Sequence, residues 1–261
     1  MNIVGYRQVR ALAGLSVLEL YRRKDLIVVF LLCAIILLPL MLFSPFGVSG
    51  ASRYVDELAL LLVWVFSLVI GLGVSARLFP PEFENRTIYP MLSKPVGRGT
   101  LLAGKYMGAL AASVSALVVF YLAYAVLIGM RQGVWFQGIL LQAFVLHVGF
   151  LVVVTALGLA GSLVMTPSAN LTLCALTLIG MLFYGQRLPE LAASQQPFGR
   201  CMLLALYAVG PHVEFFDLRQ RVVHEWPAIG WDVCLAVMVY AVGYAAVCLM
   251  LAALAFRKKK F

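Results

Sequence analysis

Residues 79–105 read FPPEFENRTIYPMLSKPVGRGTLLAGK, a long polar stretch in an otherwise apolar sequence. Apolar runs lie on both sides of it, at about 58–79 and 100–130, and each exceeds the roughly 20 residues that a membrane-spanning helix needs. The stretch therefore predicts two spanning helices joined by a polar loop, through which we expect any regulatory signal to enter. Its charged residues and prolines are Glu82, Glu84, Arg86, Lys94, Arg98, Lys105, Pro80, Pro81, Pro90 and Pro95.

The composition indicates a membrane protein. Of its 261 residues, 63% are hydrophobic and 12% are charged, which is more apolar surface than a water-soluble core could bury. The short alternating segments of an outer-membrane barrel are missing, so the sequence predicts an all-α integral membrane protein. The net charge of +9 comes from bases that flank the apolar runs, which does not favour nucleic acid as a partner.

The five cysteines are scattered without a CxxC pair, which favours neither a disulfide framework nor a metal cluster. We expect most of them to be small core residues. A bridge between Cys201 and Cys234 at one membrane face is the less favoured alternative. The sequence therefore predicts no metal and no cofactor in this chain.

Residues 1–25 show helical apolar spacing and end in a basic cluster, which predicts a helix lying in the membrane interface. Residues 185–230 hold an apolar run, 201–209, that is too short to cross a bilayer, so we expect a re-entrant or interfacial helix there. The rest of the chain, 26–261, is predicted to be one domain of six transmembrane helices with a polar loop at 80–100. The six predicted spans are 26–46, 58–79, 100–130, 139–165, 169–184 and 231–256.

The distribution of bases predicts the orientation. With both termini in the cytoplasm, 14 of the 20 Lys and Arg residues lie on the cytoplasmic side, and the reverse topology would invert this bias. We therefore expect the polar loop to be cytoplasmic and the 185–230 segment to lie on the opposite side of the membrane.

The centre of the polar loop has the pattern of a short helix. Thr87 suits an N-cap for a helix over 88–93, and Lys94 before Pro95 ends it. Such a helix would expose Tyr89, Met91 and Leu92. A partner protein could cover these side chains, and the alternative is a loop that packs on its own helix ends.

Two features in this region suggest catalysis, and both have a simpler explanation. Glu82 and Glu84 are more typical of ion pairs with Arg77 or Arg86, or of a helix N-terminus, than of a catalytic carboxylate pair. Residues 99–105 match G-x-x-x-x-G-K, but Tyr106 follows in place of Ser or Thr and no strand precedes them. We therefore expect a membrane helix at 101–107 and no nucleotide site in this chain.

Within the predicted spans, small and polar residues indicate packing. A four-residue stripe of small side chains in the third span predicts a surface that another helix can approach closely. His147 lies in mid-span, about a turn after Gln142, and is a functional candidate by default, although a hydrogen bond to a neighbouring helix is the favoured explanation. The stripe consists of Gly104, Gly108, Ala112 and Ala116.

Residues 83–88 (FENRTI), 91–98 (MLSKPVGR) and 102–108 (LAGKYMG) resemble the pattern E-x-R-T-I-x-x-L-L-S-K-P-V-S-R followed by L-x-G-K-x-x-G of type-2 ABC exporter permeases. The resemblance is greatest to the branch named for multicopper-enzyme maturation, of the nitrous-oxide-reductase accessory type. It extends to the basic cluster at 22–24, to 211–218 (PHVEFFDL) and to the FRK ending, and thus covers essentially the whole chain. Pro90 and His212 depart from that branch.

The resemblance implies a permease of a prokaryotic inner membrane that pairs with a second copy or a paralogue and sits on two ATPase subunits. ATP and magnesium would be bound by those ATPases, and a further membrane or extracytoplasmic subunit could attach. It also implies an outer gate at Pro211, His212 and Phe216. The implied ATPase-coupling residues are Glu82, Glu84, Arg86, Thr87, Ile88, Tyr89, Met91, Leu92, Lys94, Pro95 and Arg98.

The function that follows is export of an unidentified substrate with ATP hydrolysed by a separate chain. A non-transporting membrane anchor, which transmits force between an ATPase and an envelope partner, needs the same loop and is the main alternative. An ion-driven secondary transporter is less favoured, because the predicted spans hold few ionisable groups and no internal repeat is evident.

Overall fold

The computed structural model describes residues 9–15, 17–18, 51–85, 97–133, 137–224 and 226–258. All regular structure in these ranges is helical, and they contain no strand, which confirms the all-α prediction. The predicted first span, 26–46, and the predicted loop helix, 88–93, lie outside the described residues.

Apart from the beginning of α3, the long helices have the bounds that the sequence predicts to within a few residues, because prolines and a glycine mark several of their ends. Pro80 and Pro81 begin a short helix directly after the second span, and Pro167 occupies the first turn of the fifth. Gly133, with φ of 73°, ends the third span in the left-handed conformation that favours glycine. The helices are α3 Ala51–Ala76, α4 Pro80–Glu84, α6 Arg98–Gln132, α7 Gly138–Ser162, α8 Pro167–Tyr184, η1 Gly185–Arg187, α9 Leu188–Ala193, α10 Pro197–Val209, η2 Val213–Phe216, α11 Arg219–Val223 and α12 Trp231–Lys258.

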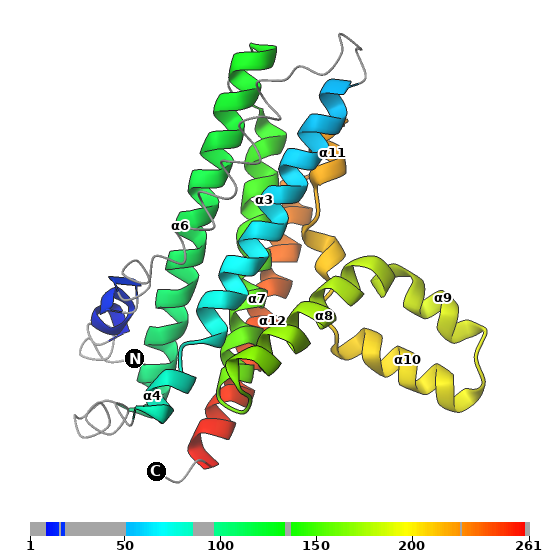
Figure 1. The fold of residues 1–261 in the computed structure, drawn as a ribbon. Coiled ribbons are helices and arrows are strands. Elements are labelled where there is room, and N and C mark those ends of the chain that lie inside the picture. Colours follow the sequence, from blue (N-terminus) through cyan, green and yellow to red (C-terminus); the bar gives the residue numbers. More distant parts are fainter. Residues whose placement is uncertain are drawn as a thin grey trace.

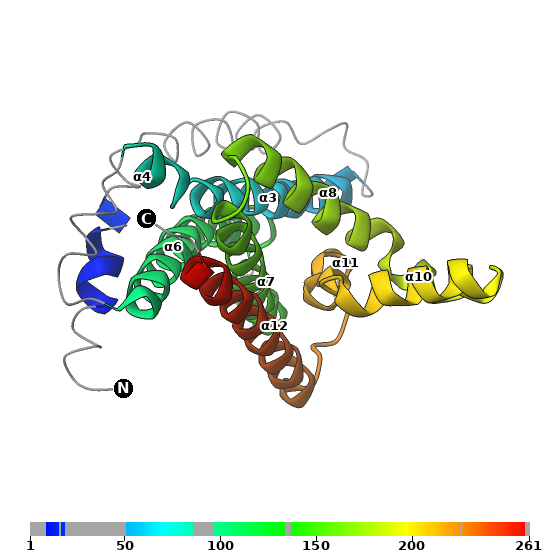
Figure 2. The same cartoon turned by 90° about the horizontal axis from the view of Figure 1, so that it is seen from below.

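Helix α7 is the centre of a bundle in which it packs against α3, α6, α8 and α12 (Figures 1 and 2). Its inward residues, among them Phe150, Leu151 and Val154, are fully buried. The sequence around them is apolar on all sides, as expected of a helix enclosed by other helices.

The bundle has two distinct ends. At one, which we call the α4 end, lie the end of α3, the beginning of α6 and the end of α12 (Figure 1). At the other, the α11 end, Gln220 of α11 donates to Glu57 near the beginning of α3 (2.8 Å), and Gln142 of α7 bonds to Ile229 just before α12. Helix α7 therefore ends at the α4 end, and α12 begins at the α11 end.

Between α7 and α12 the chain makes a side excursion. Helices α9 and α10 form a hairpin that projects from the bundle, which we call the arm (Figures 1 and 2). Helix α10 contains the predicted short helix 201–209, ends at the same residue, Val209, and has no buried residue.

Six helical stretches of the described chain are long and apolar enough to cross a membrane. Five correspond to predicted spans. The other, 197–223, is not one continuous helix, since α10, η2 and α11 are separated at 210–212 and 217–218. Because the chain enters this region at the α4 end and leaves it at the α11 end, α8 to α11 together pass once along the length of the bundle (Figure 1), and the re-entrant element stays a prediction. The six stretches are Arg53–Glu84, Arg98–Met130, Gly138–Ser162, Pro167–Ala193, Pro197–Val223 and Trp231–Lys258.

The cysteines within the described residues carry free thiols, so the Cys201–Cys234 bridge considered above is not formed. Cys201 lies exposed on the arm, whereas Cys234 is buried at the beginning of α12. The expectation that most cysteines are core residues is confirmed for Cys174, Cys234 and Cys248.

Close packing of α7 on α3 depends on Gly158. A Cβ at this position would overlap Ser75 Oγ and lie 3.0 Å from Ser75 Cβ. We expect Gly158→Ala to cost about 1–3 kcal/mol of stability, as overpacking does. Gly243→Ala on α12, where a Cβ meets nothing within 4 Å, should instead be neutral or stabilise the helix by up to about 1 kcal/mol. Thermal unfolding in detergent would compare the two variants, and equal losses would contradict the packing role.

Candidate functional site

The first candidate site is the frame that holds the two ends of the polar loop, and its centre is Lys105. This lysine is only 4% exposed, although it lies in the second turn of α6. Its ammonium forms an ion pair with Glu82 of α4 and donates to the carbonyl oxygen of Leu78 at 3.1 Å. A buried ammonium requires such partners, so the pair ties α4 firmly to α6.

Aromatic packing surrounds this ion pair. Phe79 is fully buried, and its ring centroid lies 5.9 Å from that of Phe83 and 5.5 Å from that of Phe256 at the end of α12. The Lys105 ammonium lies 5.0 Å from the Phe79 ring centroid, within the range of a cation–π interaction. The turn between α3 and α4 is thereby connected to both α6 and α12.

Arg98 completes the frame on the other side of the loop. Its guanidinium donates to the carbonyl oxygens of Phe256 (3.1 Å) and Arg257 (3.2 Å), and it lies 5.7 Å from the Phe256 ring centroid. A cation at this position also compensates the negative end of the α12 dipole. Both ends of the polar loop are thus anchored to the same two helices, α6 and α12.

The predicted ATPase-coupling residues divide into two groups. Glu82 and Arg98 are part of the frame, and Glu84 is exposed on α4. Among the described residues Glu82 pairs with Lys105, because the fold brings the beginning of α6 against α4, whereas the expected partner Arg86 lies outside the described residues. The others lie outside the described residues: Arg86, Thr87, Ile88, Tyr89, Met91, Leu92, Lys94 and Pro95.

The match to a phosphate-binding loop, 99–105, lies in the first turns of α6. Helical backbone in these residues confirms the predicted membrane helix. Lys105, which would contact phosphate in a nucleotide site, is turned toward Glu82 and Leu78.

The small-residue stripe of α6 lies at buried positions of that helix. A Cβ at Gly104 would lie 2.7 Å from the Cβ of Leu12, so the helical residues 9–15 pack directly on this glycine. Gly108 is also buried, and Ala112 and Ala116 are 1% and 2% exposed in the core between the helices. The N-terminal helix is therefore in contact with the beginning of α6, at the same end of the bundle as the frame.

A second candidate site is a polar centre inside the bundle, built around His147 of α7. Ser67 of α3 donates to the carbonyl oxygen of Trp64 (2.8 Å), so its oxygen accepts from His147 Nε2 at 2.6 Å. His147 Nδ1 then accepts from the hydroxyl of Tyr121 on α6 at 3.2 Å. The expected hydrogen bonding of His147 to neighbouring helices is confirmed, and it joins three helices.

An ion pair lies against this centre. Arg219, at the beginning of α11, donates to Asp217 through Nε (2.8 Å), Nη2 (2.6 Å) and its backbone N–H (3.1 Å). The guanidinium also lies 5.3 Å from the Trp64 ring centroid. Asp217, Arg219, Tyr121 and His147 line one small pocket, so the segment after the arm closes the polar centre from the α11 end.

Gln142 does not take part in this centre. Its amide donates to the carbonyl oxygen of Ile229 (2.7 Å) and accepts from the N–H of the same residue (3.1 Å). The role of Gln142 is therefore to hold the loop that leads into α12.

The predicted outer-gate residues lie together where the arm joins the bundle. The N–H of His212 donates to the Tyr240 hydroxyl at 3.0 Å, and its ring stacks on Phe215 at 5.2 Å. Pro211 is buried, and Phe216 is 2% exposed against α7, where a Cβ at Gly149 would approach its ring to 3.0 Å. The three residues form one packed joint between α7 and α12.

Reasoning from the sequence missed Ser67, Tyr121 and Arg219 as members of a site. Serine and tyrosine in a span carry no distinguishing pattern, whereas the DLR at 217–219 is a charged pair close to apolar runs and could have been noted. Among the residues that the structure describes, no group of three His, Cys, Asp or Glu could hold a metal ion.

Together the helices and sites define a multi-pass membrane protein, helical throughout its described regular structure, with a packed frame at the two ends of its polar loop. The family model described as "ABC-2 family transporter protein" matches residues 21–261, and the chain belongs to this family. It is thus a membrane subunit of an ABC transporter, which implies an ABC ATPase as partner. A comparison with curated proteins gave no match. The family confirms the resemblance at the level of ABC-2 permeases, and the copper and nitrous-oxide branch stays a prediction.

Proposed function

We propose that this chain is the permease of an ATP-driven exporter and that its ATPase binds the loop between α4 and α6. In this proposal two permease chains sit on two ATPase subunits, which bind ATP and magnesium. ATP-driven closure of the ATPases moves the loop and, through it, changes access to a pathway across the membrane. The branch for multicopper-enzyme maturation is the subfamily we propose.

The frame around Lys105 is the observation that carries this proposal. A loop can transmit force to a helix bundle only if both of its ends are held by the bundle and move with it. Here Glu82 holds one end of the loop and Arg98 holds the other. Glu82 connects its end of the loop to α6, and Arg98 connects the beginning of α6 to α12. The turn that follows α3 joins the frame through Phe79, which contacts Lys105 and Phe256. A push on the loop would therefore move three helices together and not only the loop.

Charge supports the proposed orientation in an inner membrane. The α4 end carries Arg77, Arg98, Lys105, Arg257 and Lys258, as expected of the cytoplasmic side. With this end inside, both termini are cytoplasmic and the joint formed by Pro211, His212 and Phe216 lies toward the outer side, where it would line or close the exit.

Replacing both Tyr89 and Leu92 by alanine tests the docking site. If these side chains fill a groove on the ATPase, losing both should weaken ATPase binding about tenfold or more, as expected when two anchoring side chains are truncated. ATP-dependent transport in reconstituted vesicles should fall with it, while thermal stability of the permease alone stays unchanged. Co-purification and titration with the ATPase measure the affinity.

The matched control is Leu251→Ala with Leu254→Ala, two exposed apolar residues on α12 (60% and 54%). This variant should bind the ATPase normally. Normal binding and transport by the Tyr89 and Leu92 variant would overturn the proposal. If the ATPase binds at the loop but hydrolysis responds only to an envelope protein and no substrate accumulates, the chain is instead a force-transmitting anchor.

A further inference from the structure

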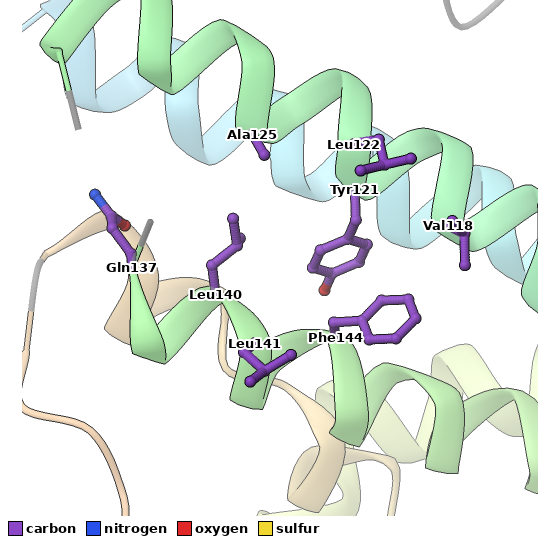
Figure 3. A pocket seen from close by; sticks show the side chains of 8 residues that line it. All are labelled: Val118, Tyr121, Leu122, Ala125, Gln137, Leu140, Leu141 and Phe144. Atoms are coloured by element: carbon purple, nitrogen blue, oxygen red, sulfur yellow. The ribbon is translucent and has the colours of Figure 1, made fainter. Parts of the chain in front are cut away.

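A pocket of about 440 Å³ lies between α6 and α7, on the part of the bundle nearer the α11 end (Figure 3). It is separate from the frame, the arm and the outer joint. Pockets of this volume commonly hold small ligands in proteins. Its walls are apolar, with Val118 and Leu122 from α6 facing Leu140, Leu141 and Phe144 from α7.

We propose that this pocket binds one acyl chain of a membrane lipid. Both helices that form it are long and apolar enough to span the bilayer, and the rim residues Leu122 and Leu141 are 61% and 44% exposed. The pocket is thus open to the surroundings of the bundle, which for a spanning helix is the hydrocarbon of the membrane. No lining residue is charged, so neither an ionic substrate nor a charged partner surface has a counterpart here.

The two polar lining residues fit a lipid that enters from the membrane surface. Gln137 directly precedes α7 at the α11 end, level with the water interface expected for that span. Tyr121 lies deeper, and its hydroxyl is already bonded to His147 at 3.2 Å. The polar group at the mouth suits a headgroup or ester, and the remaining wall suits a chain.

The lining also argues against a second copy of this chain as the occupant. Helices that pack together in membranes present small residues that let their backbones approach. Of the lining residues, only Ala125 is small, and the others are bulky. The small stripe of α6, with Ala112 and Ala116, is by contrast already buried within the core.

Tyr121 gives such a lipid a connection to the polar centre. Its ring packs edge-on against Phe144 in the pocket, with centroids 5.4 Å apart, and its hydroxyl bonds to His147 behind it. The same residue also lines the small pocket that holds Asp217 and Arg219. An acyl chain against Tyr121 would therefore contact the residue that separates lipid from the polar centre.

Photolabelling tests the proposal in the intact chain. The protein is reconstituted in phosphatidylethanolamine vesicles containing a phosphatidylethanolamine with a diazirine on one acyl chain, irradiated and digested. Label should concentrate on peptides that contain 118–125 and 137–144. Leu122→Trp or Leu141→Trp, which place a bulky ring at the rim, should reduce that label several-fold, whereas Val119→Trp should not. Val119 is a matched control because it is 51% exposed on the same helix and outside the pocket.

Label spread evenly over the exposed apolar residues, or equal labelling of the Leu122 and Val119 variants, would overturn the proposal. If a second copy of the chain occupies the pocket instead, the Leu141→Cys variant should form a covalent dimer on oxidation, and the parent chain should not. The pocket residues should then also lose their lipid label. None of these outcomes depends on the ATPase, so they do not bear on the docking proposal.

Discussion

Replacement of Glu82 by alanine is expected to destabilise the protein by about 3–5 kcal/mol, because it leaves the Lys105 ammonium buried without its counter-ion. Lys105 is 4% exposed and, among the described residues, would retain only the Leu78 carbonyl oxygen and the Phe79 ring as partners. These groups do not neutralise a charge. For a chain of this size the loss corresponds to a fall in the thermal unfolding midpoint on the order of 10 °C. Thermal unfolding in detergent measures it.

Glu84→Ala is the matched control for this variant. Glu84 lies on the same short helix, two residues away, and is exposed, so its loss should change stability by no more than about 0.5 kcal/mol. A second variant, Glu82→Ala with Lys105→Met, removes both charges and should recover much of the loss, since no charge is then left buried. Equal effects of the Glu82 and Glu84 variants would show that the ion pair does not hold the frame.

The sequence predicts the helices well because membrane spans have a strong local pattern. Length, hydropathy and the prolines at 80, 81 and 167 predict most ends of the described spans to within a few residues. The beginning of α3 is the exception, since the structure extends it to Ala51, through a segment with Arg53, Asp56 and Glu57. A helix can continue beyond the bilayer, and hydropathy alone does not register that continuation.

The sites are less predictable because each combines residues that are distant in sequence. Glu82 and Lys105 are separated by 23 positions and Arg98 contacts Phe256 across 158, so no spacing rule connects them. Proximity in the sequence favoured an ion pair of Glu82 with Arg77 or Arg86. In the structure α4 packs on α6, and Glu82 forms its ion pair with Lys105. The sequence identifies the polar residues near the spans, but it does not identify the residues with which they interact.

The contacts of the polar centre are even harder to predict from the sequence. The predicted spans hold few ionisable groups, as the sequence indicates, but Asp217 and Arg219 reach the bundle from the segment between two spans. Their side chains are 18% and 20% exposed, and they lie beside His147 and Tyr121 in one small pocket. Counting charges within spans therefore underestimates the polar content of the bundle interior. The joint after the arm is a part of the core and not a detached loop.

The Asp217–Arg219 pair should be the second most sensitive point of the fold. Asp217→Asn leaves the guanidinium of Arg219 without a negative partner next to Trp64 and the polar centre. Breaking a fully buried pair costs about 3–5 kcal/mol, and since these side chains keep about a fifth of their exposure, we expect about 2–4 kcal/mol. Arg219→Gln should cost a similar amount, because it leaves the Asp217 carboxylate unpaired in the same place.

A double-mutant cycle separates the pair from general damage to the segment. If the two charges stabilise each other, Asp217→Asn with Arg219→Gln should lose less stability than the sum of the single variants, with a coupling energy of about 1–3 kcal/mol. Arg200→Gln, at an exposed position on α10, is the control and should change stability by no more than about 0.5 kcal/mol. Strict additivity of the two single variants would contradict the pairing. A coupling in the expected range would mean that the pair stabilises the conformation of its own segment, and with it the position of the Arg219 guanidinium over the Trp64 ring of α3.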